Sequence, residues 1–375
     1  QSGGLFLSVS AKTEEQQADT LIEKIATDEE GQAIFTSDLP LGKYYIAELT
    51  APDGYHTSDE IIEVDASYRG QDSEPVIELN YDFYNKPVII EISKTDIVTG
   101  KEVIGATLTV TDSDGNVVDE WVTDGTKHYI KHLLLGETYT LTEVLPGDGY
   151  VTANDVTFTV LDTDEDGIVE VQKVEMVDDY TKVIIRKEDI ETAESVITAG
   201  LELRNEEDEV VLAWTTSEEG EIHILNEAAD IDYEVEGGEI FVAYLPIGTY
   251  TLYEVVTPFE DGYVTADPMK VVVEDTAEVQ NFVMQDDFTK LEISKVDITT
   301  KEELPGAHLV ITDDEGNVVE EWTSTEETHY IERLPVGDYT LTEISTPDGY
   351  VKAESVEFTV IDTGEIQSVI MEDDY

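Results

Sequence analysis

The sequence predicts an all-β protein made of four tandem β-sandwich domains in an elongated rod. Three observations predict this fold class: a domain-sized internal repeat, short segments of alternating apolar and polar residues around tight turns, and repeats that follow one another without a flexible linker. The predicted domains are 1–85, 86–180, 181–288 and 289–375.

The repeat has a period of about 90–110 residues, which is too long for a solenoid. Its first landmark runs from Gly-aromatic through Glu to Gly-Tyr, at 41–55, 135–150, 247–263 and 336–350. Its second landmark, near the start of the last three repeats, is EISKTD (91–96), IIRKED (184–189) and EISKVD (292–297). The third landmark closes these repeats as MVDDY (176–180), MQDDF (284–288) and MEDDY (371–375).

Strand patterns dominate inside each repeat. Residues 106–121 and 307–322 alternate on both sides of Asp-Gly or Glu-Gly, which is a strong signal for a β-hairpin. Residues 11–25 are the one candidate for a helix, and it would be short. The third repeat is longer, and its insertion at 226–238 is predicted to form an extra hairpin or loop.

The joints between repeats contain no Gly/Ser-rich or Pro-rich linker. In YTKVIIRK and FTKLEISK the last strand of one repeat runs directly into the first strand of the next. Such short joints favour a stiff rod over a flexible chain of domains.

The net charge is extreme, because 20 Lys and Arg stand against 87 Asp and Glu, a formal charge of −67. This field repels nucleic acid and anionic membranes, so neither is expected as a partner. It is typical of a surface suited to high salt, as in a halophile, or to abundant divalent cations. Weak divalent cation binding is the one cofactor-like contact expected. An acidic exterior that simply keeps the protein in solution is the alternative.

The chain contains no cysteine, which excludes disulfides, thiolate metal sites and a cysteine nucleophile. No apolar run approaches the roughly 18 residues of a membrane span, so no membrane insertion is expected in this segment. No signal peptide is visible at Gln1 and no sorting signal at Tyr375, so the chain is expected to be a processed piece of a longer protein.

Three ionisable residues recur at matching positions of the repeats. The lysines are Lys94, Lys187 and Lys295. The glutamates are Glu48, Glu143, Glu254 and Glu343. The aspartates are Asp178, Asp286 and Asp373. Strand alternation places each glutamate on the face of the apolar and Tyr residues that precede it, and Asp178 on the face of Met176, so all three types are predicted to be buried.

Charged groups on a buried face are costly unless they are paired or neutral. The three residues could form buried salt bridges, but a reaction is also available to them. Desolvation lowers the pKa of a lysine and raises that of a carboxyl group. A neutral amine can then attack a protonated Asp while the Glu transfers the proton, so that water leaves and an amide forms. Proximity makes this feasible without an enzyme.

These motifs resemble tandem Cna protein B-type domains, also called SpaA or prealbumin-like domains, the stalk units of Gram-positive surface adhesins and pilins. The Gly-Tyr stretches resemble the pilin E-box, and residues 91–121 and 174–182 resemble the first strands and the tag strand of the SpyCatcher/SpyTag parent domain. The resemblance implies immunoglobulin-like or prealbumin-like sandwiches with catalytic glutamates. The implied isopeptide bonds are Lys94–Asp178, Lys187–Asp286 and Lys295–Asp373.

The first repeat lacks its lysine. GGLFLSV (3–9) aligns with GATLTV (105–110), which places the lysine-bearing strand before residue 1. Truncation by processing explains this, and a strand donated by a neighbouring molecule is the alternative, which would be a route to a filament.

The predicted acceptor of the first repeat is Asp82, which aligns with Asp178. Asn85 is the second option, because the family often uses Asn as acceptor. Glu48 would be the catalytic residue beside either of them.

One motif, DTDEDGIVE (162–170), resembles the opening of a calcium loop. Its Glu stands at the ninth position and no helix flanks it, so an acidic hairpin turn is preferred and no metal site is predicted.

The sequence therefore predicts an extracellular, cell-surface stalk or fibre segment stiffened by self-formed Lys–Asp isopeptide bonds, whose partners are neighbouring domains or copies of itself. The alternative is an adhesin whose third repeat binds a host or polysaccharide ligand. A glycosidase-like enzyme is disfavoured, because the candidate acids recur in every repeat as scaffold features do.

Overall fold

The computed structural model describes residues 7–11, 20–36, 40–67, 80–165, 168–224 and 232–375. Two compact units are present: residues 1–147 with 151–179, and residues 148–150 with 180–375. Regular structure in the described part is almost entirely β-strand, with one 3₁₀ turn at Phe259–Asp261. No helix in that part is long and apolar enough to cross a membrane.

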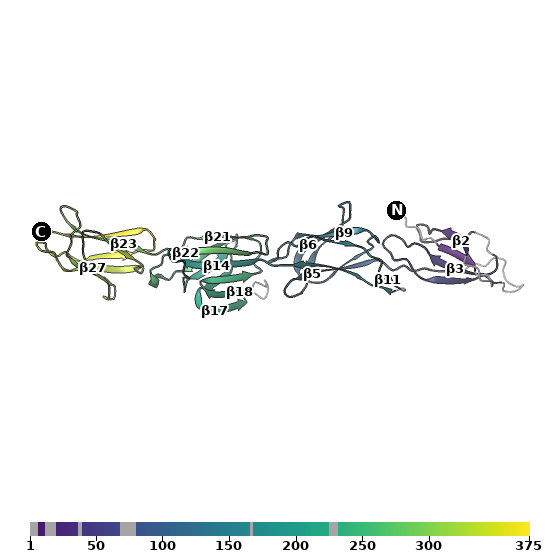
Figure 1. The fold of residues 1–375 in the computed structure, drawn as a ribbon, viewed down its shortest axis with the longest axis horizontal. Helices are drawn as coiled ribbons and strands as arrows, with labels where there is room; N and C mark the ends of the chain where they lie inside the picture. Colours follow the sequence, from purple (N-terminus) through teal and green to yellow (C-terminus); the bar gives the residue numbers. More distant parts are fainter. Residues whose placement is uncertain (1–6, 12–19, 37–39, 68–79, 166–167, 225–231) are drawn as a thin grey trace. The chain divides into compact units, whose positions relative to one another are not determined.

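The second domain shows the plan of a complete repeat, a sandwich of two sheets (Figure 1). The four-stranded sheet has the order β10-β9-β6-β7, with β6 (Ile104–Thr111), β7 (Val117–Asp124), β9 (Thr138–Leu145) and β10 (Val156–Thr159). The three-stranded sheet has the order β13-β5-β8, with β5 (Ile89–Asp96), β8 (His128–Lys131) and β13 (Gln172–Asp178). Ile90, Leu108 and Leu141 pack between them. The first strand, β5, and the last, β13, are parallel neighbours.

The fourth domain repeats this plan. Its larger sheet has the order β25-β24-β27-β28, with β24 (His308–Asp313), β25 (Val318–Thr323), β27 (Gly337–Ser345) and β28 (Val356–Val360). Its smaller sheet has the order β26-β23-β29, with β23 (Lys290–Asp297), β26 (His329–Glu332) and β29 (Ile366–Asp373). The two predicted hairpins are confirmed, because β6 pairs with β7 and β24 with β25. Gly115 and Gly316 take φ values of 82° and 85° in their turns, which favour glycine.

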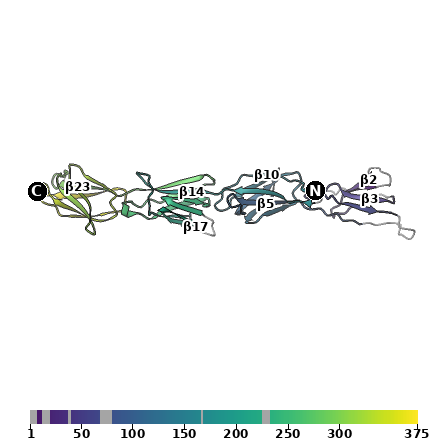
Figure 2. The same cartoon turned by 60° about the horizontal axis from the view of Figure 1, so that its bottom comes forward.

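The third domain has a larger second sheet. One sheet has the order β16-β15-β20-β21, with β15 (Gly200–Arg204), β16 (Val210–Thr215), β20 (Gly248–Val256) and β21 (Met269–Val273). The other has the order β17-β18-β19-β14-β22, with β14 (Lys182–Asp189), β17 (Ser217–Ile224), β18 (Asp232–Gly237), β19 (Glu239–Ala243) and β22 (Val279–Asp286). The insertion contributes β18, and β17 forms the edge of the sheet (Figure 2).

The first domain has one described sheet, of order β2-β1-β3-β4, with β1 (Leu7–Ala11), β2 (Thr20–Ile25), β3 (Lys43–Glu48) and β4 (Ile61–Asp65). The helix predicted at 11–25 is wrong for residues 20–25, which form β2 and pair with β1, while 12–19 lie outside the described residues. Pairing with β1, as β7 pairs with β6, outweighs the local helix signal.

The described core of the first domain is correspondingly small. Its described cluster holds three buried residues, Tyr44, Ile46 and Val64, whereas the cluster of the fourth domain holds eleven.

Candidate functional site

The second domain brings together one lysine, one glutamate and one aspartate from three strands. Lys94 lies on β5 and Asp178 on its parallel neighbour β13, while Glu143 reaches them from β9 of the facing sheet. Lys94 Nζ contacts Asp178 Oδ1 and lies 3.0 Å from Glu143 Oε1. The three side chains are at most 2% exposed, so water is excluded from the cluster.

The third and fourth domains build the same cluster. Lys187 Nζ contacts Asp286 Oδ1 and lies 3.3 Å from Glu254 Oε1. Lys295 Nζ contacts Asp373 Oδ1 and lies 3.4 Å from Glu343 Oε1. The nine residues predicted from the last three repeats thus form three buried groups, because strand alternation turns each of them inward.

Each glutamate is held in one orientation by the backbone. Its Oε2 accepts a hydrogen bond from a backbone N–H ten or twelve residues later, that of Ala153 (2.6 Å), Ala266 (2.7 Å) or Ala353 (2.7 Å). Its Oε1 has no hydrogen-bond partner of its own and faces the lysine. This arrangement places an acceptor for a proton beside the amine in each domain.

Burial raises the pKa of two of the three aspartates, Asp178 and Asp286. Burial raises the pKa of Asp178 to about 7, against the opposing effect of Lys94 and with the help of the Glu143 carboxylate. Burial also raises the pKa of Asp286 to about 7, although Lys187 lowers it. Near neutral pH a substantial fraction of each carboxyl group is therefore protonated, the form that an amine can attack.

A second recurrent aspartate was not singled out in the sequence, although it stands in the lysine landmark two residues after the lysine. Asp96, Asp189 and Asp297 are 2–4% exposed. Their Oδ1 atoms accept the N–H of Thr99 (2.6 Å), Thr192 (3.0 Å) and Thr300 (2.8 Å). Each therefore fixes the turn that follows the lysine strand.

The first domain places its candidate residues differently from the prediction. Asp82 is exposed, and it is Asn85 that reaches Glu48, with Nδ2 2.6 Å from Oε2. The joint to the next domain explains the register. Val88 N–H bonds to Gly54 O (2.9 Å) as Thr289 N–H bonds to Gly262 O (3.0 Å). Asp286 stands three residues before Thr289, and Asn85 stands three residues before Val88. Asn85 is therefore the residue of the first domain that corresponds to Asp286.

An ion pair joins the third and fourth domains within the second unit. Arg333 Nη2 donates to Asp189 Oδ2 at 2.6 Å, and the Tyr263 hydroxyl donates to the same oxygen at 3.0 Å. The guanidinium lies 4.1 Å from the centre of the Phe288 ring. Burial would raise the pKa of Asp189, but the N–H groups and Arg333 outweigh it and hold that pKa well below its usual range.

We expect Arg333→Ala to lower the free energy of opening this joint by about 1–2 kcal/mol. The variant loses a charge-assisted hydrogen bond to a buried carboxylate, and the partial exposure of the arginine limits the loss. The amide of Thr289, which donates to Gly262 O across the joint, should exchange hydrogen roughly tenfold faster. Because the pKa of Asp189 is lowered on folding, its contribution is present above about pH 4 and is lost as the pH falls further. The hydrogen-exchange rates of the variant and the wild type at this joint should therefore become equal in acid.

Arg204→Ala is the matched control for that experiment, because Arg204 forms surface ion pairs with Glu202 and Asp208 inside the third domain. It should leave exchange at the joint unchanged. Equal protection of the Thr289 amide in wild type and in Arg333→Ala at pH 7 would contradict the structural role of the pair.

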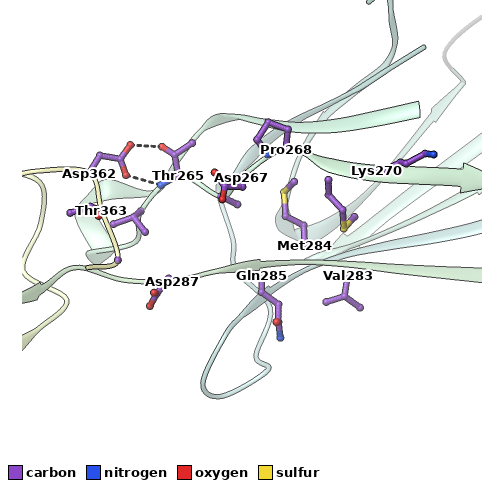
Figure 3. A pocket seen from close by; sticks show the side chains of 14 residues that line it. Thr265, Asp267, Pro268, Lys270, Val283, Met284, Gln285, Asp287, Asp362 and Thr363 are labelled. Atoms are coloured by element: carbon purple, nitrogen blue, oxygen red, sulfur yellow. Dashed lines mark hydrogen bonds between the residues drawn. The ribbon is translucent and has the colours of Figure 1, made fainter. Parts of the chain in front are cut away.

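A pocket lies beside this joint (Figure 3). It is lined by residues 264–270 and 283–285 of the third domain, by Asp287, and by residues 362–364 of the fourth. Thr265 donates to Asp362 through its N–H (2.8 Å) and its hydroxyl (2.7 Å). Thr265 and Asp362 thus bond to one another across the joint, so this wall of the pocket is part of the interface.

Within the acidic motif at 162–170, β11 (Asp164–Glu165) pairs antiparallel with β12 (Ile168–Val169), while 166 and 167 lie outside the described residues. Over the described residues, no group of three or more His, Cys, Asp and Glu side chains is placed to hold a metal ion.

The profile of the SpaA prealbumin-like fold domain matches residues 7–78, 88–176, 181–287 and 289–375. The chain belongs to this family. Each buried cluster lies within, or at the edge of, one matched prealbumin-like domain. No curated protein matches the chain.

Several solved structures are similar to it. The Bacillus anthracis TIE protein is 18% identical with a TM-score of 0.41, over 100% of this chain and 69% of that one. BcpA, the major pilin subunit of Bacillus cereus, is 17% identical with a TM-score of 0.30, over 76% of this chain and 99% of that one. The shaft pilin SpaA from Lactobacillus rhamnosus GG is 13% identical with a TM-score of 0.25, over 52% and 96%.

Proposed function

We propose that this chain is a structural segment of an extracellular surface stalk or fibre, and that its last three domains are each closed by an intramolecular isopeptide bond. The bonds join Lys94 to Asp178, Lys187 to Asp286 and Lys295 to Asp373. One observation carries the proposal: three separate domains bury a lysine amine against an aspartate carboxyl group, beside a glutamate that the backbone holds in place.

The geometry of the clusters supports the following reaction. The neutral amine attacks Cγ of the protonated aspartate, the glutamate takes the amine proton and returns it to the departing hydroxyl, and one water leaves. Burial raises the pKa of Asp178 and Asp286 and so favours the protonated form that an amine can attack. The fixed contact between amine and carboxyl group supplies the proximity that makes the step feasible without an enzyme.

The bond would tie the first strand of a domain to its last. Lys and Asp are separated by 84, 99 and 78 residues in the three domains. By analogy with a disulfide that closes a loop of this length, each bond contributes about 4.5 kcal/mol to stability. Under tension it would keep the two parallel strands from peeling apart, and unlike a disulfide it would survive reduction.

A ligand-binding role for the third repeat has less support. Two tyrosines of the third repeat that could have offered an aromatic surface to a ligand are used in packing. Tyr233 lies in the core of the domain, and Tyr244 stacks on Tyr180 with ring centres 4.4 Å apart. The partners we propose are therefore neighbouring domains or copies of the chain in a fibre. The charge of −67 suits a surface whose repulsion is screened by salt or divalent cations.

The intact mass of the denatured full chain tests the proposal. We expect the mass to fall short of the sequence by three waters, and peptide mapping to yield three branched peptides that join the named lysines to the named aspartates. An unaltered mass would reduce the clusters to buried salt bridges and would remove the basis of the proposal.

A further inference from the structure

The two strands that carry the reactive pair of the third domain end beside the joint with the fourth. Lys187 lies on β14 and Asp286 on its parallel neighbour β22. β14 ends at Asp189, two residues after the lysine, and β22 ends at Asp286 itself. The chain turns after β14, and the N–H of Ile190 donates to the carbonyl of Asp286 at 3.0 Å. The ends of the two strands are thus direct neighbours.

One side chain of the fourth domain contacts both of these ends. Arg333 Nη2 donates at 2.6 Å to Oδ2 of Asp189, the residue two positions after Lys187. The guanidinium carbon lies 4.1 Å from the ring centre of Phe288, the residue two positions after Asp286. Asp189 is 2% exposed and Phe288 is 1% exposed, so Arg333 reaches two buried groups. It therefore links the strand of the amine to the strand of the carboxyl group.

The joint brings Arg333 to this position through the backbone. The Arg333 N–H donates to Thr289 O at 2.9 Å, and Arg333 takes a φ of 61°. A Cβ at Gly262 would lie 2.4 Å from Arg333 O, so this close approach requires the glycine. Contact of the guanidinium with the two strands thus depends on docking of the fourth domain.

The joint between the first and second domains makes the same backbone contact with a different side chain. The His132 N–H donates to Val88 O at 3.0 Å, and His132 takes a φ of 66°. A Cβ at Gly54 would lie 2.6 Å from His132 O. Docking through this backbone contact therefore needs no arginine, and the guanidinium contacts of Arg333 are an addition made at the later joint.

The reaction of the third domain is sensitive to the position of these strand ends. The side chains of Lys187 and Asp286 are fully buried and in contact, and Glu254 Oε1 lies 3.3 Å from the lysine Nζ. Attack on the carboxyl carbon requires reacting atoms held in close and oriented contact, and a displacement of about 1 Å can slow such a step roughly 100-fold. A contact that fixes the ends of both strands therefore helps to fix the reacting atoms.

We propose that Arg333 is a positioning residue for the isopeptide bond of the third domain, so that docking of the fourth domain speeds bond formation in its neighbour. Arg333 touches neither reacting group and acts through Asp189 and Phe288. This role rests on the proposed function for its chemistry, and it adds a coupling between two domains.

The fourth domain supplies an internal reference for the rate. Asp297 stands two residues after Lys295, as Asp189 stands two residues after Lys187. Its Oδ2 accepts the hydroxyl of Tyr350, a residue of the same domain, at 2.9 Å. The bond between Lys295 and Asp373 is therefore expected to form at a rate that does not depend on the Arg333 side chain.

Cell-free synthesis of the full chain measures both rates in the same molecules. Translation is stopped, samples are denatured at intervals, and the branched peptides of the third and fourth domains are quantified by mass spectrometry. In Arg333→Ala we expect the Lys187–Asp286 peptide to appear roughly tenfold more slowly, a typical coupling between sites, while the Lys295–Asp373 peptide keeps its wild-type rate. A purely structural role would not change this ratio, because a domain that loses little stability stays almost entirely folded and reacts as fast as before.

Two further variants separate positioning from docking. Arg333→Lys keeps the charge that pairs with Asp189 but loses the planar group over Phe288, so its rate should fall between those of wild type and Arg333→Ala. Asp362→Ala is the matched control, because Asp362 also bonds across this joint, to the N–H (2.8 Å) and hydroxyl (2.7 Å) of Thr265 (Figure 3). It should loosen the joint and leave the rate of the third-domain bond unchanged.

The outcomes separate this inference from the proposed function. If all three waters are lost but the third-domain bond forms equally fast in wild type and in Arg333→Ala, the positioning role is refuted and the isopeptide bonds stand. Equal slowing by Asp362→Ala would also refute it, since the effect would then belong to the joint as a whole. If the wild type loses no water, both proposals fail together. Slow formation in Arg333→Ala alone, with an intermediate rate in Arg333→Lys, would establish the role.

Discussion

A Glu343→Gln chain should be one water heavier than wild type, after allowance for the substitution, and should yield Lys295 and Asp373 as unbranched peptides. The amide introduced in place of the Glu343 carboxylate cannot accept the proton of the amine, so the isopeptide bond of the fourth domain does not form. The bond would close a loop of 78 residues, so its loss costs about 4.5 kcal/mol. For a domain of this size that lowers the midpoint of unfolding by about 20 °C or more, which calorimetry of the full chain resolves.

Glu372→Gln is the matched control, since it lies on the same strand as Asp373 but forms a surface pair with Lys301 at 2.5 Å. We expect it to keep all three water losses and to change stability by less than about 1 kcal/mol. If Glu343→Gln loses as many waters as wild type, the catalytic role assigned to this glutamate is wrong, whatever its effect on stability.

Lys187→Met should make the stability of the third domain fall as the pH rises, a dependence that the wild type lacks. Without the amine, Asp286 stays a buried carboxyl group beside Glu254. Its pKa, raised to about 7 by burial even with Lys187 present, rises further once that opposing charge is gone. A carboxyl group whose pKa is raised on folding stabilises the fold fully below its unfolded pKa, near 4, and this contribution is lost as the pH rises towards the folded value.

The expected slope is about 1.4 kcal/mol of unfolding free energy per pH unit between about pH 5 and 7. Denaturant titrations of the full chain at pH 5, 6 and 7, followed through the third domain, measure it. In wild type Asp286 would be an amide and would not titrate, and the double variant Lys187→Met/Asp286→Asn should lose most of the slope. A Lys187→Met domain equally stable at pH 5 and pH 7 would contradict the raised pKa of Asp286.

Local sequence determined most of the candidate site. Strand alternation has a period of two, so the phase of Lys94, Glu143 and Asp178 relative to their apolar neighbours specified which face each would occupy. The same alternation distinguished Asp178, which is fully buried, from the adjacent Asp179, which is not. Repetition in three domains showed that the inward phase was no accident of an acidic composition.

Alignment of residue patterns failed where the first domain departs from the others. Asp82 matched Asp178 in sequence, but backbone hydrogen bonds at the joint with the next domain set the register and bring Asn85 to Glu48. The helix expected at 11–25 failed at 20–25 for a related reason, because the preference of that segment is decided by its pairing with β1.

The sequence by itself determined four β domains and three buried clusters. Burial on one face of a strand requires inward-facing residues at every second position, and this alternation is visible in the sequence. Tertiary structure alone decided which acceptor meets Glu48, that Glu48 Oε1 is left without a partner, and that Arg333 reaches Asp189 from the next domain. These contacts join residues far apart in the chain, and their geometry depends on how strands and domains meet, which no local period encodes.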